Sequence, residues 1–290
     1  MEKIYLKARA KVNLTLNILN KRQDGYHNLE SIFQKINLYD EMWIEKTNRN
    51  EFELESNIQN VRVEDNIIYK AYKKLKQEYS NLLGVKVKLN KKIPMQAGLA
   101  GGSTDCASFI LGANKLFDLQ MSKEKLESIA TVLGADVVPC LYNGAVKAQG
   151  IGEIITEIET DFKYYFVIVK PKFSCSTKEM YEKIDNKKIE HHNINNTILG
   201  LKNHNVDLIA LNLYNSFEEV TKENEEIKNV KKALSENLAI NTLLSGSGSC
   251  IFGIFENKEL AQKAYKNLKE KYETYICTSY NSRRKKYYEK

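Results

Sequence analysis

Apolar and polar residues alternate along the start of the chain. Val12 and Leu14 mark one face of residues 3–20, and a period of two is typical of a β-strand. A turn is expected at residues 22–25, because an Asp-Gly pair favours tight reversals, and residues 31–46 are expected to continue as strand. Further strand-like segments are predicted at residues 85–89, 144–157, 164–169, 243–244, 251–255 and 274–280.

The stretches between these segments repeat apolar residues at the spacing of a helix. Residues 66–75 repeat apolar positions at helical spacing after Asp65, an acidic helix start. Ser122 is suited to cap a helix over residues 123–133, which Gly134 would end. More helices are predicted at residues 107–117, 177–184, 206–220, 223–236 and 257–272. Strands and helices are mixed without regular βαβ alternation, so the pattern predicts an α+β fold.

We expect two domains, residues 1–158 and 159–290. The phosphate-binding features described below precede this boundary, and the chain restarts after it with the apolar run at 164–169. A chain of 290 residues is long enough to bury a core and leave a cleft between two lobes without disulfides or metals.

The charge balance is mildly basic, with 44 basic and 37 acidic residues and a net charge of +7. The basic residues are dispersed apart from Arg283–Lys286, which we interpret as a solvated tail. A nucleic-acid binder concentrates such residues, so we expect no nucleic-acid partner, whereas a modest positive charge suits an anionic substrate.

Other features of the composition favour the cytoplasm. The five cysteines are isolated, and no apolar run approaches the roughly 20 residues that span a bilayer. The charged N-terminal segment does not match an export signal. We therefore expect a cytoplasmic protein with no membrane partner.

A Gly-rich segment from Pro94 to Asp105 lies between a predicted strand and a predicted helix. Glycine lets successive N–H groups point at an anion, and a helix start adds unpaired N–H groups and the positive end of its dipole. Ser103 and Thr104 add hydroxyl groups for phosphate or Mg²⁺. The segment has neither the Walker pattern nor the dinucleotide pattern. It predicts a triphosphate cradle of another type; the alternative is a loop that only turns.

Two other segments carry candidate catalytic groups. Lys11 and Asn13 share one strand face, where a lysine would neutralise a transferring phosphoryl group. Asp136 follows Gly134 in an apolar setting, where a carboxylate would take a proton from a hydroxyl. Taken singly, the first segment is more typical of a solvated face, and Asp136 is more typical of a cap or turn residue.

Two loops are candidate ligand contacts. Residues 24–29 place Tyr26 beside His27, a pair suited to stack on a base and bond its edge; the alternative is an ordinary surface turn. Residues 244–250 form a second Gly/Ser loop, which either approaches a ligand or simply turns a hairpin. The spacings of cysteine and histidine fit no zinc site. The sequence also has no GxSxG motif, so nothing in it points to hydrolase chemistry.

Taken together, these segments resemble the GHMP kinase superfamily over nearly the whole chain. Its Pro-x-x-x-Gly-Leu-x-Gly-Gly-Ser-Ser motif is present as Pro94–Thr104, with Ala100 and Thr104 in place of the commoner Gly and Ser. Within it, the chain is similar to the branch that phosphorylates 4-diphosphocytidyl-2-C-methyl-D-erythritol in the non-mevalonate isoprenoid pathway. Pro139 lies one position later than is common in that branch. The similarity to this branch rests on residues 10–14, 24–29, 134–137 and 150–153.

The resemblance implies a two-domain fold with an N-terminal ATP-binding lobe, a C-terminal α/β lobe and an active site in the cleft between them. It implies Lys11 and Asp136 as the catalytic pair, and Asn13 as a contact of the substrate hydroxyls. His27 would read the cytosine edge. The implied aromatic clamp on the base consists of Tyr26 and Tyr181.

The resemblance also implies ATP with Mg²⁺, which Ser103 would approach, and no certain protein ligand for the metal. Asn66 would lie near the adenine. We expect a monomer or a weak homodimer whose partners are ATP and a cytidine diphosphate-linked metabolite. The implied phosphate-binding residues are Pro94, Met95, Gln96, Ala97, Gly98, Leu99, Ala100, Gly101, Gly102, Ser103 and Thr104.

Three alternatives stay open. A kinase of the same superfamily acting on homoserine or a mevalonate derivative would not need the base-binding segment at 24–29 or Tyr181. A catalytically silent nucleotide-binding protein would not need both Lys11 and Asp136. A nucleic-acid-binding protein would bind without ATP and release steeply with salt.

Overall fold

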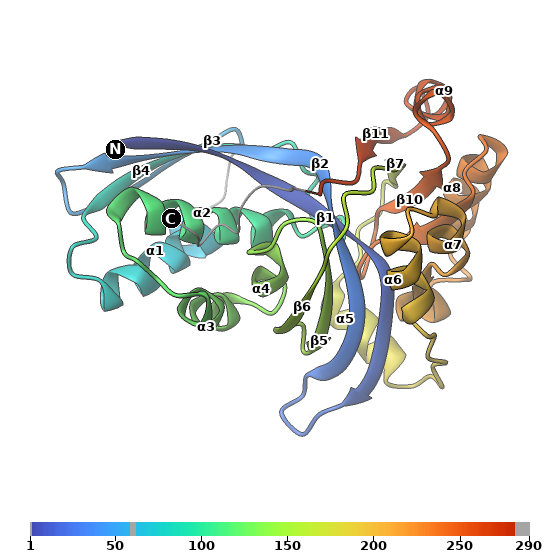
Figure 1. Ribbon diagram of the computed structural model, residues 1–290, viewed down its shortest axis with the longest axis horizontal. Coiled ribbons are helices and arrows are strands. Elements are labelled where there is room, and N and C mark those ends of the chain that lie inside the picture. The colour runs from blue at the N-terminus through green and yellow to red at the C-terminus, as the bar shows by residue number, and fades with distance from the viewer. Residues whose placement is uncertain (1, 59–61, 282–290) are drawn as a thin grey trace.

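A long hairpin, drawn in blue, extends from one end of the molecule and bends between the helices of its two halves (Figure 1). The computed structural model describes residues 2–58 and 62–281. Strand β1 (Lys3–Lys21) pairs antiparallel with β2 (His27–Thr47) along its entire length. This confirms the alternating strand and the turn after it, and β2 begins four residues before the predicted start. The basic run Arg283–Lys286 lies outside the described residues.

The hairpin is the centre of a seven-stranded sheet with the order β3-β4-β2-β1-β8. Strand β2 pairs with β4 (Gly84–Asn90) near its end and with β5 (Ala145–Gly150) near its start. The remaining strands of the sheet are β3 (Phe52–Ser56) beside β4, β6 (Ile154–Ile158) beside β5, and the short β8 (Tyr214–Asn215) beside β1.

Four helices cover one face of this sheet in the first half of the chain (Figure 1). Asn66 and Ser122 cap two of them, because their side chains accept the N–H groups of Ile68 and Lys125. The helix predicted at 107–117 begins at Gly101, six residues before the predicted start. The elements are the 3₁₀ turn η1 (Val63–Asp65), α1 (Ile67–Glu78), α2 (Gly101–Phe117), α3 (Lys123–Leu133) and α4 (Val137–Cys140).

The second half of the chain builds a four-stranded sheet with the order β11-β7-β10-β9. The four central residues of its strand β7 (Tyr165–Lys170) are apolar because both faces are covered: Phe166 and Ile168 pack toward the hairpin, Val167 and Val169 toward α8 and α9. The other elements are α5 (Thr177–Ile184), α6 (Asn195–Lys202), α7 (Val206–Leu211), η2 (Ser216–Val220), α8 (Glu225–Glu236), β9 (Asn241–Leu244), β10 (Ile251–Phe255), α9 (Lys258–Leu268) and β11 (Glu273–Thr278).

One predicted helix is wrong. Residues 206–220 divide into α7, β8 and η2, because Tyr214 and Asn215 pair with Thr15 and Leu16 of the hairpin. The α+β prediction is confirmed, whereas the boundary at 158/159 stays a prediction. Within the described part of the chain, none of the helices is long and apolar enough to cross a membrane.

The hairpin contributes to three separate hydrophobic clusters. Met42 belongs to the cluster under α1 and α2, Val12 and Leu14 to the one facing the second sheet, and Leu16 and Leu29 to the one beneath α8 and α9. All five side chains are buried. The strand that carries Lys11 and Asn13 is therefore held in place by the packing of its alternate residues Val12, Leu14 and Leu16.

Candidate active site

A cavity of about 1100 Å³ lies where β1, the Gly-rich loop, α4, α5 and the second Gly/Ser loop converge. Segments that are distant in the sequence thus meet at one concave surface. The predicted site residues in its wall are Lys11, Asn13, Asn66, Pro94, Met95, Gln96, Ala97, Gly98, Leu99, Ala100, Gly101, Gly102, Asp136 and Tyr181. The predicted site residues outside this wall are Tyr26, His27, Ser103 and Thr104.

The Gly-rich loop delivers the start of α2 to the cavity. Ala100 precedes the helix in the left-handed conformation, with φ of 56°, and no side chain caps the helix start. The first-turn N–H groups of α2 therefore keep their hydrogen-bonding capacity, and the positive end of the helix dipole lies beside them. This arrangement is an anion cradle of the kind that phosphate groups occupy.

The second Gly/Ser loop supports the first. The Ser245 hydroxyl donates to the Gly98 carbonyl at 3.0 Å, and the Cys250 N–H donates to the Ala97 carbonyl at 3.2 Å. Gly98 has a φ of 72°, and a Cβ there would lie 1.8 Å from the Ser245 carbonyl oxygen. Glycine is required at this close approach. The second loop also lines the cavity through residues 246–248.

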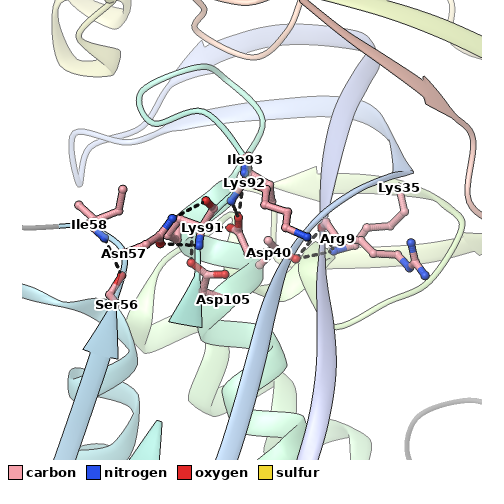
Figure 2. Close-up of polar contacts among 11 residues, drawn as sticks. Arg9, Lys35, Asp40, Ser56, Asn57, Ile58, Lys91, Lys92, Ile93 and Asp105 are labelled. Carbon is pink, nitrogen blue, oxygen red and sulfur yellow. Dashed lines mark hydrogen bonds and ion pairs between the residues drawn. The ribbon is translucent and has the colours of Figure 1, made fainter. Parts of the chain in front are cut away.

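The hydroxyl of Thr104 is directed at β1. It donates to the Arg9 carbonyl at 2.6 Å and accepts from the Lys35 ammonium at 3.0 Å. Lys35 also donates to the Arg9 carbonyl, as Figure 2 shows. Burial lowers the pKa of Lys35. These contacts fasten the first turn of α2 to the strand two residues before Lys11, and Ser103 lies half-buried in the same turn.

Lys11 is a buried cation in the cavity wall. Its ammonium donates to the Asn13 side-chain oxygen at 2.7 Å and lies 4.7 Å from the centre of the Phe33 ring. Asn13 in turn donates to the Ser31 hydroxyl at 2.9 Å. In the described part of the chain no carboxylate pairs with Lys11, although the residue is only 4% exposed. Asp136, which is exposed, lies in the same cavity at the start of α4.

A buried acid–base cluster, which the sequence reasoning missed, adjoins the Gly-rich loop (Figure 2). Lys91 donates to Asp40 and to Asp105, at 2.5 Å from the Asp105 oxygen, and Asp40 also accepts the Ile93 N–H at 2.8 Å. Burial raises the pKa of Asp105 well above its usual range. Burial opposes the charge on Lys91, but the two carboxylates raise its pKa overall.

This cluster fixes the entry to the loop. Asn57 accepts the N–H of Lys91 at 2.8 Å and donates to its carbonyl at 3.0 Å, so the backbone before Pro94 is bonded on both sides (Figure 2). Lys91 and Asp105 also line the cavity. The signal in the sequence was an acidic residue on the buried side of a helix directly after a Gly-rich loop.

The residues predicted to read a base are only partly assembled. Tyr181 stacks on His27 with ring centres 4.7 Å apart and planes at 21°. Tyr26 is 58% exposed on the turn between β1 and β2. His27 Nε2 lies 2.6 Å from the carboxylate of Asp185, a residue that the sequence reasoning did not single out.

Two family models match the chain: the GHMP kinases N terminal domain over residues 66–144 and the GHMP kinases C terminal domain over residues 197–274. A 4-diphosphocytidyl-2-C-methyl-D-erythritol kinase of Clostridium beijerinckii is 42% identical, with 94% of this chain and 98% of the relative covered. The enzyme of the same name from Clostridioides difficile is 38% identical, with 96% of each chain covered.

Solved structures agree with these matches. The crystal structure of a 4-(cytidine 5'-diphospho)-2C-methyl-D-erythritol kinase superposes with a TM-score of 0.82 at 26% identity, covering 96% of this chain and 100% of the other. A homoserine kinase from Cytophaga hutchinsonii shares the fold, with a TM-score of 0.76 at 19% identity over 96% of this chain and 95% of that chain. The chain belongs to the GHMP kinases and, among them, to the family of 4-diphosphocytidyl-2-C-methyl-D-erythritol kinases.

Proposed function

We propose that this chain transfers the γ-phosphoryl group of ATP to the 2-hydroxyl of 4-diphosphocytidyl-2-C-methyl-D-erythritol, giving the 2-phosphate and ADP in the non-mevalonate isoprenoid pathway. The family supports the substrate. The observation that carries the chemistry is Lys11, a buried ammonium group without a carboxylate partner in the described residues, in a wall shared with an anion cradle and Asp136.

Each group has one part in the proposed transfer. The N–H groups of the Gly-rich loop and the start of α2 hold the triphosphate, and Lys11 stabilises negative charge on the transferring group. The substrate oxygen bonds to the γ-phosphorus as the bond to the bridging β–γ oxygen breaks, and the hydroxyl proton passes to Asp136. Positioning and charge supply most of the catalysis in such reactions, so this small set of groups is sufficient.

The remaining contacts are proposals of the same kind. Asn13 would bond the methylerythritol hydroxyls beside Lys11, and Asn66 would lie near the adenine at the start of α1. His27 with Tyr181 would bind the cytosine, and Tyr26 would close over it from the exposed turn. Support comes from the shared cavity for Asn13, Asn66 and Tyr181, and from the stacking of His27 on Tyr181.

We propose that Mg²⁺ arrives with ATP. The described residues form no group of three or more His, Cys, Asp or Glu side chains that would hold a metal. Mg²⁺ usually keeps several waters and takes its other ligands from phosphates and one or two protein oxygens, so this wall fits a nucleotide-bound ion. Ser103 would supply the protein hydroxyl, and the metal would neutralise phosphate charge.

The test is ATP consumption by the purified protein with 4-diphosphocytidyl-2-C-methyl-D-erythritol, homoserine or mevalonate as acceptor. Turnover with the cytidylated alcohol alone supports the proposal. Turnover with another alcohol would support kinase activity but reject the proposed substrate. No turnover with any of the three alcohols would favour a silent nucleotide-binding protein. We further propose a monomer or weak homodimer, which sedimentation of the purified chain would check.

A further inference from the structure

The carboxylate of Asp185 connects the hairpin to α5 beside the predicted base site. Its Oδ1 lies 2.6 Å from His27 Nε2, and Lys21 also contacts the carboxylate. Asp185 is the C-cap of α5, and its own N–H donates to the Tyr181 carbonyl at 3.0 Å. The side chain of His27 is 7% exposed. Asp185 therefore holds both the ring of His27 and the helix turn that carries its stacking partner.

This contact decides which ring nitrogen of His27 carries a proton. Hydrogen bonds from Lys21 and His27 lower the pKa of Asp185, so the carboxylate is ionised at neutral pH and only accepts hydrogen bonds. The nitrogen that faces it, Nε2, must then be the donor. In a neutral imidazole the other nitrogen, Nδ1, is left as an acceptor. Among the described residues, the His27 ring has no hydrogen-bond partner besides Asp185, so Nδ1 stays available to a ligand.

A hydrogen-bond acceptor at this position distinguishes cytosine from uracil. Cytosine carries a donor amino group on C4, whereas uracil carries an acceptor carbonyl there. A lone pair on Nδ1 bonds the first and repels the second. We propose that Asp185 is a positioning residue that keeps His27 Nδ1 unprotonated and thereby makes the site select cytosine over uracil. This inference rests on the proposed function, because it assigns the base specificity of the same site.

Histidine tautomers are read directly by ¹⁵N NMR. In the full chain, we expect His27 to show a protonated Nε2 and an unprotonated Nδ1, with its signals assigned by their loss in His27→Asn. In Asp185→Asn the amide can donate to Nε2, so we expect a shift of the proton to Nδ1. A protonated Nδ1 in the unaltered chain would overturn the inference, whatever the enzyme phosphorylates.

Binding of CDP and UDP, measured by calorimetry without ATP, tests the consequence. We expect the unaltered chain to prefer CDP, and Asp185→Asn to reduce the preference about tenfold or more, because one hydrogen bond is lost and one buried group is left unpaired. Asp185→Glu should restore much of it. Lys21→Met is the matched control: it removes the other partner of the carboxylate and should leave the CDP/UDP ratio unchanged.

The outcomes separate this inference from the proposed function. An unchanged ratio in Asp185→Asn, an equal fall in Lys21→Met, or no binding of either nucleotide would overturn the role of Asp185. A chain that prefers CDP through Asp185 but does not phosphorylate the cytidylated alcohol would refute the proposed reaction and leave the base specificity standing.

Discussion

Alanine at Gly98 should separate the two glycine loops. Its Cβ would lie 1.8 Å from the Ser245 carbonyl oxygen, and φ is 72°, a conformation that costs an alanine about 1–2 kcal/mol. Moving the loops apart breaks the two hydrogen bonds that Ser245 and Cys250 donate, each contributing about 1 kcal/mol. We expect Gly98→Ala to lower the free energy of unfolding by about 3–4 kcal/mol and to raise the KM for ATP.

Urea unfolding of the purified variant measures the loss of stability, and Gly102→Ala is the matched control. Gly102 lies four residues further on in α2, where an added Cβ would meet no atom nearer than Ile67 at 4.0 Å. Alanine there should stabilise the helix by about 0.5–1 kcal/mol. If Gly98→Ala unfolds at the same urea concentration as the unaltered chain, the two loops are not held together as described.

Four further predictions concern the site. Asp136→Asn should lower kcat by about 10²–10⁴-fold while ATP still binds, and Lys11→Ala should abolish most turnover with ATP binding likewise retained; near-normal kcat in Asp136→Asn would remove its role as base. Tyr181→Ala should raise the KM of the cytidylated substrate more than that of ATP, and an unchanged substrate KM would contradict stacking on the base. The raised pKa of Asp105 means that the folded state holds this proton more tightly than the unfolded chain, so the stability it contributes is present below its ordinary value of 3.8 and is lost as pH rises through the raised value. Asp105→Asn, which still accepts from Lys91, should therefore gain stability relative to the unaltered chain as pH rises above 3.8; urea unfolding at two pH values checks this, and a constant difference would refute it.

Local patterns in the sequence predicted much of the fold. The alternation in β1 and the cap at Ser122 are short-range signals, and both elements form at the expected residues. The early start of α2 at Gly101 was missed because glycine is a poor helix former, and the helix begins there to present N–H groups to the cavity. The break at Tyr214 was missed because it depends on pairing with a strand about 200 residues away.

For the site as well, residues with a local sequence signal were predicted and residues that depend on distant contacts were missed. Motif residues such as Lys11 and Asp136 were proposed from their own neighbours in sequence, and the structure brings them to one cavity. Asp40 and Asp185 gave no such signal, because each acts on a side chain from a distant element: Asp40 on Lys91, and Asp185 on the hairpin. Long-range pairs of this kind are decided by packing, which a single sequence does not display.

The hairpin shared by all three clusters has a consequence for how such enzymes diversify. A recombinant that joined residues 1–158 of this chain to the rest of a distant relative would bring β1 side chains against unmatched residues in two hydrophobic clusters. Exchanging one lobe of this architecture between distant relatives is therefore expected to disrupt the packing of the hairpin. New acceptor preferences should arise instead by point substitutions at the hairpin tip and on α5, which leave the nucleotide cradle unchanged.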